Sequence, residues 1–251
     1  MKKIVYLLIF FSTVFAACDK ADSGTTSKTT GTDGNTGQGG SLARFTTAMD
    51  HLYVVDDRKL YTYSLANSAN PQLKGNIDVG FSIETIFSYK DKLFIGSGTA
   101  MYVYSLANPA QPAKLGQATH VRACDPVVAN DSLAYVTVRS GSRCGGNVSA
   151  LIVYDVKYVT QPIERNRVIM ESPWGLGING NRLYVCNGNN GLNVYDITDP
   201  IRPVLKKQLS GNTFYDVIIL DNMMIAMIEG GTAIFELKAN DEITLAARIT
   251  N

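Results

Sequence analysis

Polar and aromatic residues recur at two equivalent positions of a repeated pattern, and these are the residues whose types could do chemistry. Aligning the recurring Leu-Tyr-Val segments places acidic, basic and aromatic side chains in two successive rings at the starts of the expected inner strands. The rings predict a small polar pocket with an aromatic platform, suited to a sugar or a peptide. The alternative is a solvated channel mouth in which opposite charges neutralise one another. The first ring holds Ala43, Glu84, Asp125, Trp174 and Tyr215, and the second holds Arg44, Thr85, Pro126, Gly175 and Asp216.

The carboxylates of these rings could support glycoside hydrolysis. That reaction needs one acid and one base or nucleophile about 5 to 10 Å apart. Arg44 would keep a neighbouring carboxylate ionised and make it a poor general acid, and pairing of the carboxylates with Arg44 and Arg122 would favour binding over catalysis. His51 and His120 lie in expected loops without a nucleophile elbow. A binding module is therefore the leading hypothesis, and a glycosidase-like enzyme is the alternative. The three carboxylates are Glu84, Asp125 and Asp216.

An insertion distinguishes the third repeat from the others. It runs from Arg139 to Asn147 and contains Cys144. Because the entry to the first strand and the hairpin between strands two and three lie on the same face of a blade, Cys124 and Cys144 can approach each other. A disulfide between them would contribute about 3 kcal/mol through loop closure. The remaining Cys186 is expected to be buried, or to be the true partner of Cys124.

The two arginines of this insertion are candidate ligand contacts. A hairpin pinned by Cys124 and Cys144 would place Arg139 and Arg143 beside the channel mouth near Asp125. Loops on a rigid scaffold are where binding residues concentrate. We therefore expect this hairpin to be the most distinctive surface of the protein.

The body of the chain is a repeat of about 41 residues. An apolar run with an aromatic residue recurs five times at intervals of 41, 50, 41 and 40 residues. A second apolar segment precedes each run, and Gly, Asn or Asp turns join the two. Two strands of every unit are thus marked directly. The recurring aromatic residues are Tyr63, Tyr104, Tyr154, Tyr195 and Phe235.

Units of this length with four short strands each are typical of β-propeller blades. We therefore expect an all-β fold with five four-stranded blades in residues 42–251. The chain begins at an inner strand and ends at an outer one, so the ring should close without a blade that shares both termini. The expected blades are about 42–81, 82–122, 123–171, 172–212 and 213–251.

One unit carries a specific resemblance. Leu192-Asn193-Val194-Tyr195-Asp196-Ile197-Thr198-Asp199-Pro200, followed by Pro203, resembles the LVIVD repeat of bacterial lipoproteins. Ser64 and Ser105 replace the motif aspartate in the first two units. The resemblance implies a secreted or surface propeller, and it implies no particular reaction.

The N-terminus predicts export and lipid attachment. Lys2 and Lys3 precede an apolar run, up to Ala17, that is too short to span a bilayer and reads as a signal peptide of residues 1–17. The small residues before Cys18 resemble a bacterial lipobox, in which this cysteine is acylated. Ordinary signal-peptidase cleavage near Ala17 is the alternative.

Residues 18–41 read as a flexible tether because the Gly-, Ser- and Thr-rich run contains no large apolar side chain. We expect the protein to be anchored in the outer membrane, on its periplasmic or its surface leaflet, and to bind a protein or glycan partner at one face of the propeller.

The composition argues against several other classes. Lys and Arg total 23 against 22 Asp and Glu, so the basic excess needed to bind nucleic acid is missing. Four cysteines and two histidines show no metal-ligand spacing. We expect no metal and no cofactor.

Overall fold

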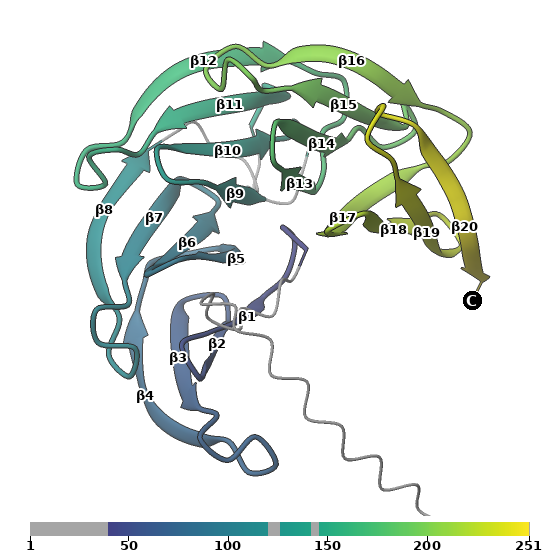
Figure 1. The fold of residues 1–251 in the computed structure, drawn as a ribbon. Helices are drawn as coiled ribbons and strands as arrows, with labels where there is room; N and C mark the ends of the chain where they lie inside the picture. Colours follow the sequence, from purple (N-terminus) through teal and green to yellow (C-terminus); the bar gives the residue numbers. More distant parts are fainter. Residues whose placement is uncertain (1–39, 120–125, 142–145, 251) are drawn as a thin grey trace, which may run out of the picture. The chain divides into compact units, whose positions relative to one another are not determined.

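The computed structural model describes residues 40–119, 126–141 and 146–250. These residues form twenty strands in five antiparallel sheets, and each sheet contains four strands in chain order. The prediction of an all-β propeller with five four-stranded blades is confirmed (Figure 1). Within the described ranges, no helix has the length and apolar character needed to cross a membrane.

The blades are numbered along the chain, and within each blade the strands run in order from the centre of the propeller to its rim (Figure 1). Blade 1 contains β1 (Phe45–Ala48), β2 (His51–Val55), β3 (Lys59–Ser64) and β4 (Gln72–Asp78). Blade 2 contains β5 (Ile83–Tyr89), β6 (Lys92–Ser97), β7 (Ala100–Ser105) and β8 (Ala113–Thr119). Blade 3 contains β9 (Val127–Ala129), β10 (Leu133–Val138), β11 (Ala150–Asp155) and β12 (Ile163–Ile169). Blade 4 contains β13 (Leu176–Asn179), β14 (Arg182–Cys186), β15 (Leu192–Asp196) and β16 (Val204–Leu209). Blade 5 contains β17 (Phe214–Leu220), β18 (Met223–Ile228), β19 (Gly231–Leu237) and β20 (Ile243–Thr250).

The polar residue that ends the third strand of blades 1 to 4 starts the turn to the outer strand. In each case its side-chain oxygen accepts a hydrogen bond from the backbone N–H two residues later, at 2.8 to 3.3 Å. Serine and aspartate both make this short turn. The replacement of the motif aspartate by serine in blades 1 and 2 therefore preserves the local structure. The four residues are Ser64, Ser105, Asp155 and Asp196.

A β-bulge recurs in every blade between the third and fourth strands. The register shifts immediately before the recurring aromatic residue of each repeat, from Tyr63 in blade 1 to Phe235 in blade 5. A bulge bends its strand and increases the local twist. The sequence period thus corresponds to a repeated backbone irregularity as well as to a repeated pattern of burial.

Neighbouring blades pack face to face through apolar side chains. The inner strands follow one another around the centre, with β1 against β5, β5 against β9, β9 against β13, and β13 against β17. Polar contacts add to this packing. The Tyr53 hydroxyl donates to the Pro109 carbonyl of blade 2, and the Tyr135 hydroxyl donates to the Pro200 carbonyl of blade 4, each at 2.8 Å.

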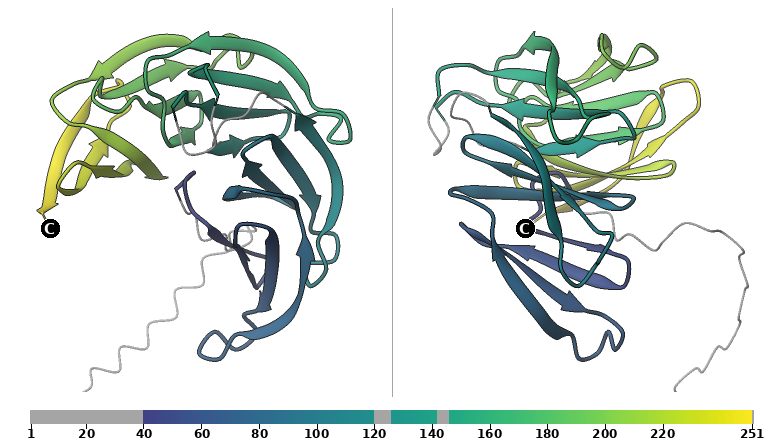
Figure 2. Two further views of the ribbon diagram at one scale, coloured as in Figure 1. Left: turned by 180° about the vertical axis from the view of Figure 1, so that it is seen from behind. Right: turned by 90° about the vertical axis from the view of Figure 1, so that its left-hand side faces the viewer.

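The side between blades 5 and 1 differs from the other four interfaces. No blade shares both termini, as expected, because β1 to β4 and β17 to β20 form separate sheets. The expectation that the ring closes is wrong for the described residues: the facing sides of blades 1 and 5 lie apart (Figures 1 and 2), and Phe45 and Met227 are 58% and 54% exposed. The sequence pattern specified each blade but not the angle between successive blades.

Candidate functional site

A polar hollow with aromatic walls lies where blades 4 and 5 meet. Its volume is about 320 Å³. Its lining residues come from the segment between β12 and β13, the β14–β15 hairpin and the start of β17, which the topology places on one face of the propeller. The residues that line it are Glu171, Ser172, Trp174, Gly188, Asn189, Asn190, Thr213 and Tyr215.

Two aromatic rings form the wall of this hollow. Trp174 and Tyr215 meet edge to face, with ring centroids 5.0 Å apart and an interplanar angle of 76°. The Arg139 guanidinium lies 3.5 Å from the centroid of the Trp174 ring, which is a cation–π contact. Partial burial lowers the pKa of Arg139. Burial of a guanidinium on an aromatic face leaves a fixed positive charge next to the hollow.

The β14–β15 hairpin forms one side of the hollow, and its loop is held in place by hydrogen bonds. The buried Asn187 accepts a hydrogen bond from the Ser172 N–H through its side-chain oxygen at 2.9 Å. Gly188 has φ of 56°, a conformation that favours glycine, and its carbonyl accepts the Phe214 N–H at 3.1 Å. The Thr213 hydroxyl lies 2.9 Å from the Asn189 amide oxygen. These contacts hold the three loops together.

Asp216 lies beside this hollow but is buried beneath its surface. Its carboxylate accepts hydrogen bonds from the Ser41 hydroxyl and the Leu42 N–H, both at 3.1 Å, and from the Val217 N–H at 2.9 Å. Burial raises the pKa of Asp216 to about 6, although the three donors act in the opposite direction. A Cβ on Gly175 would lie 2.0 Å from the Asp216 Oδ1, so the backbone packs directly against the carboxylate.

Asp216 therefore ties segment 40–42 to blade 5. The Ser41 hydroxyl also accepts the Leu176 N–H at 2.6 Å, so segment 40–42 bridges blades 4 and 5. The sequence suggested Asp216 as a ligand contact or as one of the carboxylates of a glycosidase. In the structure its oxygen atoms face backbone and hydroxyl donors within the propeller.

The remaining residues suggested by the sequence divide into two groups. In blades 1 and 2, the Arg44 guanidinium donates to the carbonyl oxygens of Ile83 and Glu84. Neither Arg44 nor Glu84 lines the hollow between blades 4 and 5. The other suggested residues lie outside the described ranges: Cys18, Arg122, Cys124, Asp125, Arg143 and Cys144. The structure therefore brings together Arg139, Trp174 and Tyr215, with Asp216 beneath them.

Sequence reasoning missed the polar part of the lining. It interpreted Asn187 to Gly191 only as a hairpin turn and did not consider Ser172 or Thr213. A usable signal was present, because the rule that brings the entry to strand one next to the hairpin between strands two and three also applies to blade 4. That rule places Asn189 and Asn190 beside Trp174.

Cys186 is buried and free. Burial, together with the nearby Asp216 carboxylate, raises the pKa of the Cys186 thiol well above its usual value. A protonated thiol without solvent access is not a nucleophile. In this structure Cys186 therefore acts as a small core residue and is not bonded to Cys124. The predicted Cys124–Cys144 bond lies outside the described residues.

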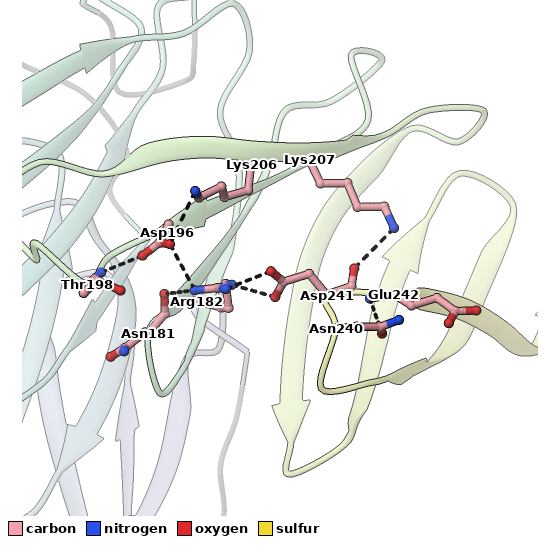
Figure 3. Close-up of polar contacts among 9 residues, drawn as sticks. All are labelled: Asn181, Arg182, Asp196, Thr198, Lys206, Lys207, Asn240, Asp241 and Glu242. Atoms are coloured by element: carbon pink, nitrogen blue, oxygen red, sulfur yellow. Dashed lines mark hydrogen bonds and ion pairs between the residues drawn. The ribbon is translucent and has the colours of Figure 1, made fainter.

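A network of charges joins blades 4 and 5 on the opposite face (Figure 3). Arg182 makes two contacts with Asp241, Nε to Oδ1 at 2.6 Å and Nη2 to Oδ2 at 2.8 Å, and a third with Asp196 at 3.4 Å. Lys206 approaches Asp196 at 3.8 Å, and Lys207 donates to the Asp241 carbonyl at 3.3 Å. These charges are paired with one another, so the network is a structural tie between the blades.

Among the described residues, no group of three or more His, Cys, Asp or Glu side chains could hold a metal ion.

Residues 173–210 match the model of the LVIVD repeat. This range covers blade 4 and includes Trp174 and the β14–β15 hairpin, and the match confirms the resemblance that the sequence indicated. The propeller thus contains an LVIVD repeat in the blade that supplies most of the hollow. No curated protein matches the chain.

Solved structures share the fold at low sequence identity. A periplasmic gluconolactonase of Pseudomonas aeruginosa aligns with a TM-score of 0.62 and 11% identity, over 80% of this chain and 69% of that one. The computationally designed protein Ika8 gives 0.58 and 10%, over 82% and 60%. Hsv2 of Kluyveromyces lactis gives 0.54 and 11%, over 80% and 60%. The chain thus spans 60 to 69% of the length of these structures, and the likeness extends to the fold alone.

Proposed function

We propose that this protein is a lipid-anchored propeller of the bacterial cell envelope that acts as a binding module. The hollow between blades 4 and 5 is its ligand site. The observation that carries this proposal is the preformed group of Trp174, Tyr215 and Arg139 above a floor of amide and hydroxyl side chains. A concave site with aromatic walls and a few convergent polar groups is the usual form of a small-ligand site.

The chemistry of the lining favours a glycan or a short polar peptide. Asn189, Asn190, Ser172 and Thr213 can each donate and accept hydrogen bonds, as sugar hydroxyls and peptide groups require. The rings of Trp174 and Tyr215 offer apolar area beside them. The positive Arg139 and the negative Glu171 give the site no strong net charge.

A glycan array tests the site directly. The full chain should bind a subset of glycans, and Trp174→Ala or Tyr215→Ala should weaken that binding at least about tenfold, because each removes an aromatic wall. Tyr158→Ala is the matched control, since this tyrosine is 71% exposed and lies in the turn between β11 and β12, outside the hollow. Equal loss in all three variants, or unchanged binding in the first two, would contradict the proposal. Peptide arrays with the same variants test the second ligand class.

The proposed location rests on the N-terminal sequence. The acyl chain on Cys18 would hold the protein in the outer membrane. The Gly-, Ser- and Thr-rich tether would set how far from the membrane the propeller can reach a ligand.

A predicted disulfide between Cys124 and Cys144 would hold the insertion of blade 3 near Arg139. Peptide mapping under non-reducing conditions would test this pairing.

The glycosidase alternative receives less support. Asp216 is engaged by three donors inside the propeller, and Glu171 is the one carboxylate among the residues that line the hollow. Hydrolysis by an acid and a base requires two carboxylates facing one sugar. The arrangement of the described residues therefore fits ligand retention better than bond cleavage.

A further inference from the structure

The Arg139 side chain lies against the face of Trp174, one of the two aromatic residues that line the hollow between blades 4 and 5. Its guanidinium carbon is 3.5 Å from the centre of the ring. At this separation the flat face of the guanidinium contacts the ring, and the N–H groups at its edge are left for other partners. Because Trp174 also lines the hollow, a ligand that extends past this ring reaches those N–H groups.

The protein offers this guanidinium no anionic partner. No residue in the described part of the chain accepts a hydrogen bond from the Arg139 side chain or forms an ion pair with it. Arg139 is nevertheless partly buried, and this burial lowers its pKa. Arg167 and Arg182 differ, because Glu164 and Asp241 hold them and raise their pKa values. A partly desolvated guanidinium without an acceptor costs free energy, which an anionic group on a ligand would offset.

Other polar groups of the hollow are also available to a ligand. The Trp174 indole N–H lies beside the hairpin, since a Cβ on Gly188 would be 3.1 Å from Nε1. Within the described ranges, neither this N–H nor the Ser172 hydroxyl nor the Glu171 carboxylate is engaged by another side chain. Ligand hydroxyl groups can serve all three, because a hydroxyl accepts from an indole N–H and donates to a carboxylate.

The two charges of the site set where the parts of a ligand must lie. Arg139 and Glu171 form no ion pair with each other, so both stay available. Glu171 would repel an anion placed next to it. An anionic group therefore belongs beside Arg139, and hydroxyl groups belong beside Glu171.

The size of the hollow favours a sugar over a peptide. Its volume of about 320 Å³ is at the lower end of the range of about 300 to 1,000 Å³ that is usual for small-ligand sites. An extended peptide requires a longer groove, whereas a sugar ring is compact and can place an apolar face on Trp174 or Tyr215.

We propose that the hollow binds a glycan that carries a carboxylate, as uronic acids do. The Arg139 guanidinium holds the carboxylate, and Glu171, Ser172 and the Trp174 indole N–H hold the hydroxyl groups. The planar fork of an arginine can bind both oxygens of a carboxylate at once, which makes it selective for this group. This inference rests on the proposed ligand-binding function of the hollow and narrows it to one chemical class.

An array of acidic oligosaccharides tests the inference with the full chain. Oligosaccharides of glucuronate, galacturonate and mannuronate are each printed beside their own methyl esters, which keep the size and remove the charge. At least one acid should bind at least about tenfold more tightly than its ester, because the ester loses the charge-assisted hydrogen bonds to Arg139. We call this factor the acid preference.

Three variants assign the acid preference to its residues. Arg139→Gln should reduce it to about one, and Arg139→Lys should leave an intermediate value, because lysine keeps the charge but not the fork. Glu171→Gln should increase the acid preference, because it removes a negative charge from the hollow, and a misfolded variant could not show such a gain. Arg58→Gln is the matched control, since Arg58 also stacks on an aromatic ring, that of Phe81, but does not line the hollow.

The outcomes separate this inference from the function on which it rests. Equal binding of acids and esters, or an acid preference that survives Arg139→Gln, would overturn the carboxylate assignment and leave glycan binding by the hollow intact. An acid preference that falls equally in Arg58→Gln would also overturn it. Binding of peptides with no binding of any glycan would overturn both the carboxylate assignment and the choice of a glycan as ligand.

Discussion

Replacing the buried Asp216 by asparagine should change how the stability of the propeller depends on pH. The carboxylate is 7% exposed and accepts hydrogen bonds from Ser41, Leu42 and Val217. Burial raises its pKa from 3.8 to about 6 in the folded protein. The unfolded chain should titrate near the ordinary value, so folding takes up a proton between about pH 4 and pH 6.

The sign and the size follow from this proton uptake. A raised pKa makes a contribution to stability that is fully present below pH 4 and is lost as the pH rises through 6. The two pKa values differ by about 2, which corresponds to about 3 kcal/mol of unfolding free energy. The Asp216→Asn variant cannot take up this proton. Relative to the wild-type protein, the variant should therefore gain about 3 kcal/mol between pH 4 and pH 7.

Urea unfolding of the full chain at pH 4, 5, 6 and 7, followed by the fluorescence of the single tryptophan, measures this difference. Comparing variant with wild type at each pH cancels the titration of all other groups. Asp196→Asn is the control, because hydrogen bonds from Thr198 and the nearby Arg182 lower the pKa of Asp196 from 3.8, so that its substitution should leave the pH dependence between pH 4 and pH 7 nearly unchanged. A difference between Asp216→Asn and wild type that stays constant from pH 4 to pH 7 would refute the reasoning.

Three further predictions concern interactions elsewhere in the protein. A double-mutant cycle with Arg182→Gln and Asp241→Asn should give a coupling of about 1 kcal/mol, measured by urea unfolding, because the contact is bidentate and partly shielded; no coupling would mean that the pair contributes nothing. Tyr135→Phe should cost about 1 kcal/mol in the same assay, because the Pro200 carbonyl loses its donor, and an unchanged midpoint would contradict this. Cys18→Ala should move the protein from the membrane fraction to the soluble fraction, and sedimentation after a high-salt wash would exclude the acyl anchor.

The sequence alone was sufficient to predict the blades because their determinants are local. Continuous apolar runs such as Leu151 to Tyr154 specify burial on both faces of a strand. The polar residue at the end of the third strand starts the next turn whether it is Ser64 or Asp196. The period also aligned Trp174 with Tyr215. Because the period is local, the equivalent positions of the five repeats could be aligned without knowledge of any tertiary contact.

Tertiary structure decided what those aligned residues do. Trp174 and Tyr215 line a hollow only because the β14–β15 hairpin reaches over from blade 4, whereas Asp216, one residue later, is buried beneath segment 40–42. Whether the Asp216 carboxylate contacts a ligand or bonds to buried backbone donors depends on the packing of segment 40–42 against it, and that segment is distant in the sequence. The opening between blades 5 and 1 depends on the angles between successive blades, which are set by many side-chain contacts in the four packed interfaces (Figure 1). No local sequence pattern encodes these angles, so the opening between blades 5 and 1 could be recognised only in the assembled propeller.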